Sequence, residues 1–179
     1  MCGIVGAVSA KDSTPFLLEG LATLEYRGYD SAGLALLDSE SFNGLQRARS
    51  KGRVVELANK VAQESLHGNV GIAHTRWATH GVPAERNAHP HISGGLAVVH
   101  NGIIENYESL REKLQGFGYE FTSDTDTETI AHLIQACFKG QIGEPAENLF
   151  SAVQCAVVHL KGAFALAAIS EEEPDCVVV

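Results

Sequence analysis

The chain opens with Met1-Cys2-Gly3-Ile4-Val5-Gly6, and its second residue governs how the rest of the sequence is interpreted. Cysteine is small enough for an aminopeptidase to remove Met1, which would leave a thiol and a free α-amine on one residue. An unperturbed thiol titrates near ~8.5 and an α-amine near ~7.7–8.0, so at neutral pH part of the amine can accept the thiol proton. The opening predicts either a self-activated nucleophile or simply a small residue at the start of a buried strand.

Length, composition and charge are those of an ordinary globular domain. The 179 residues fall in the single-domain range, with 45% hydrophobic and 20% charged residues. A net charge of −9 gives no general attraction for nucleic acid or for an anionic membrane surface. No apolar run approaches the ~20 residues of a membrane span, and the amino terminus lacks the pattern of a signal peptide. We therefore expect one cytoplasmic domain without a nucleic-acid or membrane partner.

Hydrophobic periodicity and turn residues predict alternating strands and helices without a linker or repeat. The predicted strands are residues 2–8, 32–37, 43–48, 70–75, 96–100, 119–122, 163–170 and 176–179. The predicted helices are residues 14 to about 28, 53–66, about 106–115, the segment opened by the capping box Thr125-x-x-Glu128, and 145 to about 160. This mixture favours an α+β layered sandwich over a doubly wound parallel sheet. No glycine-rich phosphate-binding motif is present.

Three further segments combine polar side chains with glycine, namely Tyr26–Gly33, His74–Gly81 and Val98–Asn106. Arg76 lies at the end of a predicted strand, where its guanidinium can bind a carboxylate through two parallel hydrogen bonds. Asn101-Gly102 directly follows a predicted strand, and its side-chain amide and backbone N–H can both point at the same atom of a ligand. Such a pair suits an oxyanion hole, although Asn-Gly is also a common turn.

Five histidines fall within 27 residues of each other, namely His74, His80, His89, His91 and His100. Imidazole is the commonest metal ligand, so a zinc- or iron-dependent hydrolase has to be considered. The spacing His89-x-His91 can chelate a metal, but there is no His-Glu-x-x-His motif and no Cys-x-x-Cys pair. The sequence favours turn and core histidines, and it predicts neither a metal nor another cofactor.

Taken together, Met1–Gly6, Leu24–Gly33, His74–Gly81 and His100–Asn106 resemble the glutaminase domains of class II glutamine amidotransferases, and most closely that of glucosamine-6-phosphate synthase. The resemblance runs from residue 2 to beyond residue 170, in the family's order. Amidophosphoribosyltransferase shares the amino-terminal Cys-Gly-Ile but differs in the other segments, and it stays as the alternative. The resemblance implies an N-terminal nucleophile fold, a four-layer αββα sandwich with two packed sheets between helical layers.

The resemblance implies that the chain hydrolyses the side-chain amide of L-glutamine. Cys2, once it is terminal, is the implied nucleophile, and its own α-amine is the implied general base. Asn101 and the Gly102 N–H are implied to hold the oxyanion of the tetrahedral intermediate. On this basis the chain is an enzyme whose chemistry needs no cofactor.

The same resemblance implies which residues bind the substrate. Arg76 would bind the α-carboxylate and Asp126 the α-ammonium of glutamine, although Asp126 alone would be interpreted as a structural acid in a helix's first turn. The implied contributions of the neighbouring loop are Trp77 as a mobile cover that gates ammonia, and Thr79 and His80 as additional substrate contacts. The residues expected to support the site are Arg27, Gly28 and His89.

In the family, the glutaminase domain continues past the segment matching Val177–Val179 and joins two sugar-isomerase domains that bind fructose 6-phosphate. We therefore expect residues 2–179 to be a glutaminase domain truncated at its C-terminal end, with the isomerase domains absent from this chain. The resemblance implies that the full-length protein is a homo-oligomer that makes glucosamine 6-phosphate from fructose 6-phosphate. The remaining alternative is a fragment that binds glutamine without hydrolysing it.

Overall fold

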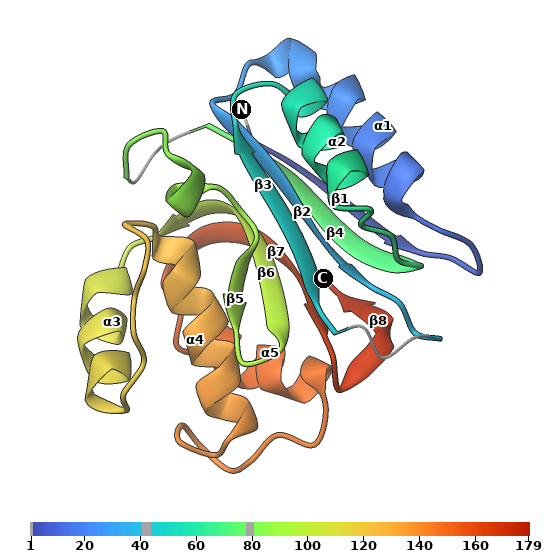
Figure 1. Ribbon diagram of the computed structural model, residues 1–179. Helices are drawn as coiled ribbons and strands as arrows, with labels where there is room; N and C mark the ends of the chain where they lie inside the picture. Colours follow the sequence, from blue (N-terminus) through green and yellow to red (C-terminus); the bar gives the residue numbers. More distant parts are fainter. Residues whose placement is uncertain (1, 41–43, 78–80) are drawn as a thin grey trace.

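The computed structural model describes residues 2–40, 44–77 and 81–179, apart from the side chain of Arg27. Two antiparallel four-stranded sheets pack face to face, and helices cover the outer face of each sheet (Figure 1). The result has four layers, in the order helices, sheet, sheet, helices. Every helix in the described part of the chain is too short or too polar to span a bilayer.

The first half of the chain builds one outer layer and one sheet. Its strands are arranged in the order β1-β4-β2-β3, with all neighbours antiparallel. The elements are β1 (Gly3–Val8), α1 (Thr14–Leu24), the 3₁₀ helix η1 (Glu25–Arg27), β2 (Ser31–Leu37), β3 (Gln46–Lys51), α2 (Val54–Gln63) and β4 (Val70–Arg76). Helices α1 and α2 lie side by side on the outer face of this sheet (Figure 1).

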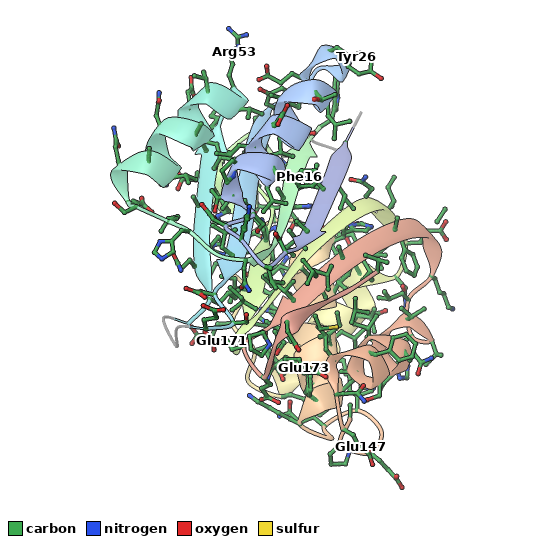
Figure 2. The ribbon with its side chains drawn as sticks, turned by 90° about the vertical axis from the view of Figure 1, so that its right-hand side faces the viewer. Phe16, Tyr26, Arg53, Glu147, Glu171 and Glu173 are labelled. Carbon is green, nitrogen blue, oxygen red and sulfur yellow. The ribbon has the colours of Figure 1, made fainter. Side chains whose placement is uncertain are left out.

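The second half builds the other sheet, in the order β5-β6-β7-β8, and the opposite outer layer. Its elements are the 3₁₀ helix η2 (Glu85–Asn87), β5 (His91–Ser93), β6 (Leu96–Ile104), α3 (Tyr107–Gly116), α4 (Asp126–Phe138), α5 (Leu149–Val157), β7 (Gly162–Ser170) and β8 (Glu173–Val178). Glu171, which is labelled in Figure 2, lies in the turn between β7 and β8. Its carboxylate accepts a hydrogen bond of 2.6 Å from the Leu45 N–H ahead of β3. This contact joins the two halves.

The apolar run of β2 follows from its position inside the layers. All seven of its residues are buried, because one face packs on α1 and α2 and the other on the second sheet. Leu34 and Leu36 face the helices, whereas Ala35 and Leu37 face the second sheet. A strand that is buried on both faces shows no polar alternation, which is why the sequence has an unbroken hydrophobic stretch there.

One predicted strand is wrong. Residues 119–122, all of them described, form no strand. The rings of Tyr119 and Phe121 pack instead against the ring of His132 in α4, with centroid distances of 4.9 and 4.7 Å. The backbone N–H of Thr122 donates to the Glu128 carboxylate, so this segment is fixed by side chains and not by a neighbouring strand.

The capping box at the start of α4 is only half formed. The Thr125 hydroxyl accepts from the Glu128 N–H, as predicted, at a distance of 3.4 Å. The Glu128 carboxylate does not return this bond to Thr125 but binds Thr122 and Ser123. Glu128 therefore organises the loop that leads into the helix.

Several predicted boundaries shift. The strand predicted at 43–48 is β3 at 46–51, and residues 41–43 lie outside the described part. The last helix begins at Leu149 and not at Pro145, because Asn148 and Ser151 form a reciprocal capping box. Strand β5 has only three residues, too few for a periodic signal, and was not predicted. The other helices and strands were predicted to within a few residues.

Candidate active site

A cavity of about 640 Å³ opens between the two sheets and the start of α4. It is lined by Cys2, Arg76, Trp77, His89, His100, Asn101, Gly102, Ile103, Thr125, Asp126 and Thr127. The predicted site residues among these are Cys2, Arg76, Trp77, His89, Asn101, Gly102 and Asp126. Segments that are far apart in the sequence therefore meet at one cavity.

Cys2 lies half-buried immediately before β1. The antiparallel register pairs Gly3 with Thr75, which brings Cys2 to the end of β4. There the backbone N–H of Trp77 donates to the Cys2 Sγ at 3.2 Å. A backbone N–H directed at sulfur is a hydrogen bond that strengthens when the thiol becomes a thiolate. Met1 lies outside the described residues.

Asn101 and Gly102 lie within β6, which continues to Ile104 instead of ending at residue 100 as predicted. Gly102 has φ +122, and a Cβ there would lie 2.2 Å from the carbonyl O of Ala163 in β7. Only glycine fits this position. The Asn101 Oδ1 lies 2.8 Å from the Nε2 of His74, a residue that does not line the cavity.

Arg76 is the last residue of β4 and is only 4% exposed, although its side chain lines the cavity. Its Nη1 lies 3.5 Å from the Asp30 Oδ1, and its Nη2 donates to the Gly81 carbonyl at 3.2 Å. A buried guanidinium held on both sides is a rigid partner for a carboxylate. Sequence analysis gave Asp30 no role, although it belongs to the glycine-punctuated segment Tyr26–Gly33.

Asp126 is the first residue of α4 and is 4% exposed. Its Oδ2 accepts from the Ile104 N–H at 2.9 Å, and its Oδ1 lies 4.0 Å from the His100 Nδ1. The carboxylate is thus fixed at the cavity wall by β6. A carboxylate in this setting suits a cationic group of a ligand.

Three residues of the cavity lining, Thr127, His89 and His100, are joined by hydrogen bonds. The Thr127 Oγ1 lies 3.0 Å from both the His89 Nε2 and the His100 Nδ1. One hydroxyl has one proton, so Thr127 can donate to no more than one of the two rings and accepts from the other. Burial, followed by the repulsion that neighbouring histidines would exert if protonated and by nearby Arg76, holds the pKa of His89 well below its ordinary value, so this ring is neutral. Sequence analysis assigned no role to Thr127 or His100.

Trp77 is 53% exposed at the mouth of the cavity. Gly28, which ends η1 with φ +70, lies under its indole, because a Cβ on Gly28 would approach the Trp77 Cζ3 to 2.8 Å. Gly28 therefore contacts Trp77 and is not among the residues that line the cavity, and its supporting role stays a prediction. The side chain of Arg27 and residues Thr79 and His80 lie outside the described part of the chain, and their roles stay predictions.

The buried histidines form contacts with one another and with hydroxyl groups. The His74 and His89 ring centroids lie 4.2 Å apart, and the His91 Nε2 lies 3.0 Å from the Thr125 Oγ1. Within the described ranges, no group of three or more His, Cys, Asp or Glu side chains is arranged to hold a metal ion.

Comparison with known proteins identifies the family of this chain. The profile of the glutamine amidotransferase domain matches residues 74–179. The chain is 58% identical over 180 residues to the glutamine–fructose-6-phosphate aminotransferase (isomerizing) of Pseudomonas putida, and 54% identical over 176 residues to that of Legionella pneumophila (strain Paris). These alignments cover 99% and 98% of this chain but only 28% of each relative.

The fold is also found in a solved structure. Glutamine phosphoribosylpyrophosphate amidotransferase from B. subtilis matches with a TM-score of 0.77 and 26% identity, over 96% of this chain and 35% of that chain. This likeness, with two antiparallel sheets between helical layers, confirms the α+β sandwich of the N-terminal nucleophile type. The chain belongs to the glutamine amidotransferase domain family, and its match is to the glutaminase region of glutamine–fructose-6-phosphate aminotransferases.

Proposed function

We propose that this chain hydrolyses the side-chain amide of L-glutamine to glutamate and ammonia through the Cys2 thiolate. The observation that carries this proposal is the meeting of a thiol, a buried guanidinium, a buried carboxylate and an Asn-Gly pair at one cavity. The four features match the four chemical needs of the reaction. They are a nucleophile, partners for both charged groups of an amino acid, and donors for an oxyanion.

The first half of the reaction forms a thioester. After removal of Met1, the α-amine of Cys2 accepts the thiol proton, and the thiolate attacks the carboxamide carbon. Asn101 and the Gly102 N–H stabilise the oxyanion that forms. The α-amine then returns its proton to the leaving nitrogen, and ammonia departs as the tetrahedral intermediate collapses. A water molecule hydrolyses the thioester by the same sequence of proton transfers, releasing glutamate and restoring the thiol.

Selection of glutamine rests on its two charged groups. Arg76 binds the α-carboxylate through its forked guanidinium, and Asp126 binds the α-ammonium. Trp77 covers the mouth of the cavity and gates the departing ammonia, with Thr79 and His80 contributing from the same loop. Arg27, Gly28 and His89 support these groups.

The ammonia is used, in our proposal, to convert fructose 6-phosphate to glucosamine 6-phosphate in the cytoplasm. The support is the name shared by relatives at 54–58% identity. Because this chain spans 28% of their length, we propose that residues 2–179 act as the glutaminase domain of a longer, homo-oligomeric protein whose sugar-isomerase domains bind fructose 6-phosphate. The amidophosphoribosyltransferase alternative has weaker support, at 26% identity.

The proposal is tested by intact mass measurements before and after exposure to an electrophilic glutamine analogue. We expect loss of Met1 and a single adduct, which free glutamine blocks and which Cys2→Ala lacks. Cys2→Ala should also lower the glutaminase kcat by a factor of about 10⁴ or more. A chelator should leave the activity unchanged.

Other results would contradict the proposal in distinct ways. Binding of glutamine without hydrolysis, in a chain that has lost Met1, would favour the glutamine-binding fragment. Loss of activity on chelation, together with full activity of Cys2→Ala, would favour a metal-dependent hydrolase. An adduct that glutamine does not block would mean that the thiol is reactive outside a glutamine site.

A further inference from the structure

One hydrogen bond crosses from the first sheet to the second directly behind the cavity. It joins the His74 Nε2 in β4 to the Asn101 Oδ1 in β6, at 2.8 Å. Asn101 lines the cavity, whereas His74 is fully buried and does not line it. His74 therefore contacts one of the implied oxyanion donors from the side away from the substrate.

The orientation of the Asn101 carboxamide decides the direction of this bond. A carboxamide oxygen only accepts, so with the Asn101 Oδ1 toward His74, the His74 Nε2 carries the proton. Burial lowers the pKa of His74 to about 3, and the smaller opposing effects of its contacts with the Asn101 side chain and the His100 backbone do not offset this, so the ring is neutral at pH 7. A neutral ring with its proton on Nε2 has a bare Nδ1.

The direction matters because an asparagine carboxamide has two nearly equal ends. Rotation by 180° about the last side-chain bond exchanges the oxygen for the NH₂ group. With the NH₂ group toward the cavity, Asn101 donates to an oxyanion, whereas with the oxygen in that place it would repel one. Preorganised donors of this kind lower a barrier because they need no reorientation during the reaction.

We propose that His74 is a positioning residue for glutamine hydrolysis, which holds the Asn101 carboxamide with its NH₂ group toward the developing oxyanion. The inference rests on the proposed function. It adds a residue that does not line the cavity and that acts through Asn101.

A merely structural role is the competing explanation. His74 fills space between the sheets and lies against His89, with ring centroids 4.2 Å apart. Loss of such a buried ring lowers stability whatever its effect on catalysis. A decisive experiment must therefore separate an effect exerted through Asn101 from a general loosening of the site.

A double-mutant cycle makes this separation. We expect His74→Leu to lower kcat by about 10–100-fold with KM within about 3-fold, as for a misaligned oxyanion donor. Asn101→Ala should lower kcat by about 10²–10³-fold. When Asn101 is already alanine, adding His74→Leu should change kcat by less than about 2-fold, because nothing remains to be positioned.

Two further variants serve as controls. His74→Gln places an amide donor near the former Nε2 and should retain kcat to within about 5-fold. His132→Leu removes another buried histidine, one that bonds to the Ser93 Oγ and the Glu120 carbonyl and lies outside the cavity lining. It should lower stability without lowering kcat.

A measurement on the unsubstituted protein completes the test. Nitrogen NMR of the imidazole distinguishes the two neutral tautomers, and we expect a protonated Nε2 and a bare Nδ1 for His74. The opposite tautomer would overturn the proposal, because the Asn101 oxygen would then lie toward the cavity. This result does not depend on whether any variant folds.

The remaining outcomes are equally clear. An undiminished effect of His74→Leu in the Asn101→Ala background would overturn the positioning role while leaving the glutaminase function intact. If the unsubstituted chain neither hydrolyses glutamine nor labels at Cys2, the proposed function fails. The expected tautomer in such an inactive chain would mean that the geometry is right and the reaction is wrong.

Discussion

At the scale of single residues, the site requires a position without a Cβ atom. Gly102 supplies an implied oxyanion donor and also lets β7 approach, since a Cβ would lie 2.2 Å from the backbone O of Ala163. Because that neighbour is backbone, it cannot rotate away as a side chain could. The φ of +122 adds a second cost for any other residue.

We therefore expect Gly102→Ala to lower the free energy of unfolding by about 2–3 kcal/mol and kcat by at least about 100-fold. Urea unfolding and a glutaminase assay measure the two effects. Gly116→Ala, at the end of α3 where nothing lies within 4 Å of an added Cβ, is the matched control. It should leave kcat unchanged and raise stability by up to about 1 kcal/mol. Unchanged unfolding of Gly102→Ala would show that the strands adapt.

At the scale of elements, the start of α4 shows how one side chain holds a substrate-binding residue in place. The Glu128 carboxylate accepts from the backbone and hydroxyl groups of Thr122 and Ser123, at 2.7–3.1 Å. Burial disfavours its charge, but these hydrogen bonds outweigh burial and lower the pKa of Glu128 below its ordinary value of 4.5. The loop it fixes leads directly into Asp126.

Glu128→Gln should lower the free energy of unfolding by about 2–3 kcal/mol at pH 7, since an amide cannot accept all of these bonds. It should also raise KM for glutamine by displacing Asp126. Because the folded pKa is depressed, the contribution of Glu128 is complete above pH 4.5 and is lost as the pH falls through the folded pKa. Urea unfolding from pH 7 to pH 3 measures it. The exposed Glu112→Gln should change stability by less than about 0.5 kcal/mol, and an equal effect of both variants would contradict this role.

Local patterns predicted most elements, because their signals lie within one stretch of sequence. The apolar face of α1, the buried run of β2 and the proline at the start of α1 are of this kind. The strand predicted at 119–122 is wrong because its aromatic residues pack on His132, a contact that no local pattern contains. Contacts between distant residues limited the prediction of the site in the same way.

Cys2 and Arg76 were proposed from their own chemistry, and Asp126 needed the family resemblance. The contributions of Asp30 and Thr127 depend on contacts with residues 46 and 38 positions away, so only the folded chain reveals them. Site residues that belong to sequence motifs can thus be predicted. The residues that support them cannot be predicted in this way, because their contacts depend on how the two sheets pack.

At the scale of the whole molecule, the two-sheet sandwich encloses several histidines in a neutral state. Burial, followed by repulsion from nearby arginines and from neighbouring rings if these were protonated, holds the pKa of His74, His89 and His91 well below the ordinary value of 6.5. In the unfolded chain these rings bind protons below about pH 6.5, whereas in the folded chain they do not. The unfolded state therefore gains protons first, and stability must fall as the pH falls.

Between pH 7.5 and pH 5.5, protonation of each such ring in the unfolded chain should lower the free energy of unfolding by about 1.4 kcal/mol. The three rings together should therefore lower it by about 4 kcal/mol. Carboxylates are ionised in both states over this interval and contribute little. Urea unfolding at the two pH values measures the loss. His91→Gln should reduce it by about 1.4 kcal/mol, whereas the exposed His159→Gln should not change it. A loss of about 1.4 kcal/mol or less would mean that at least two of the three rings accept protons within the folded sandwich. Water would then reach the space between the sheets, and the neutral His74 tautomer that orients Asn101 would survive only at higher pH.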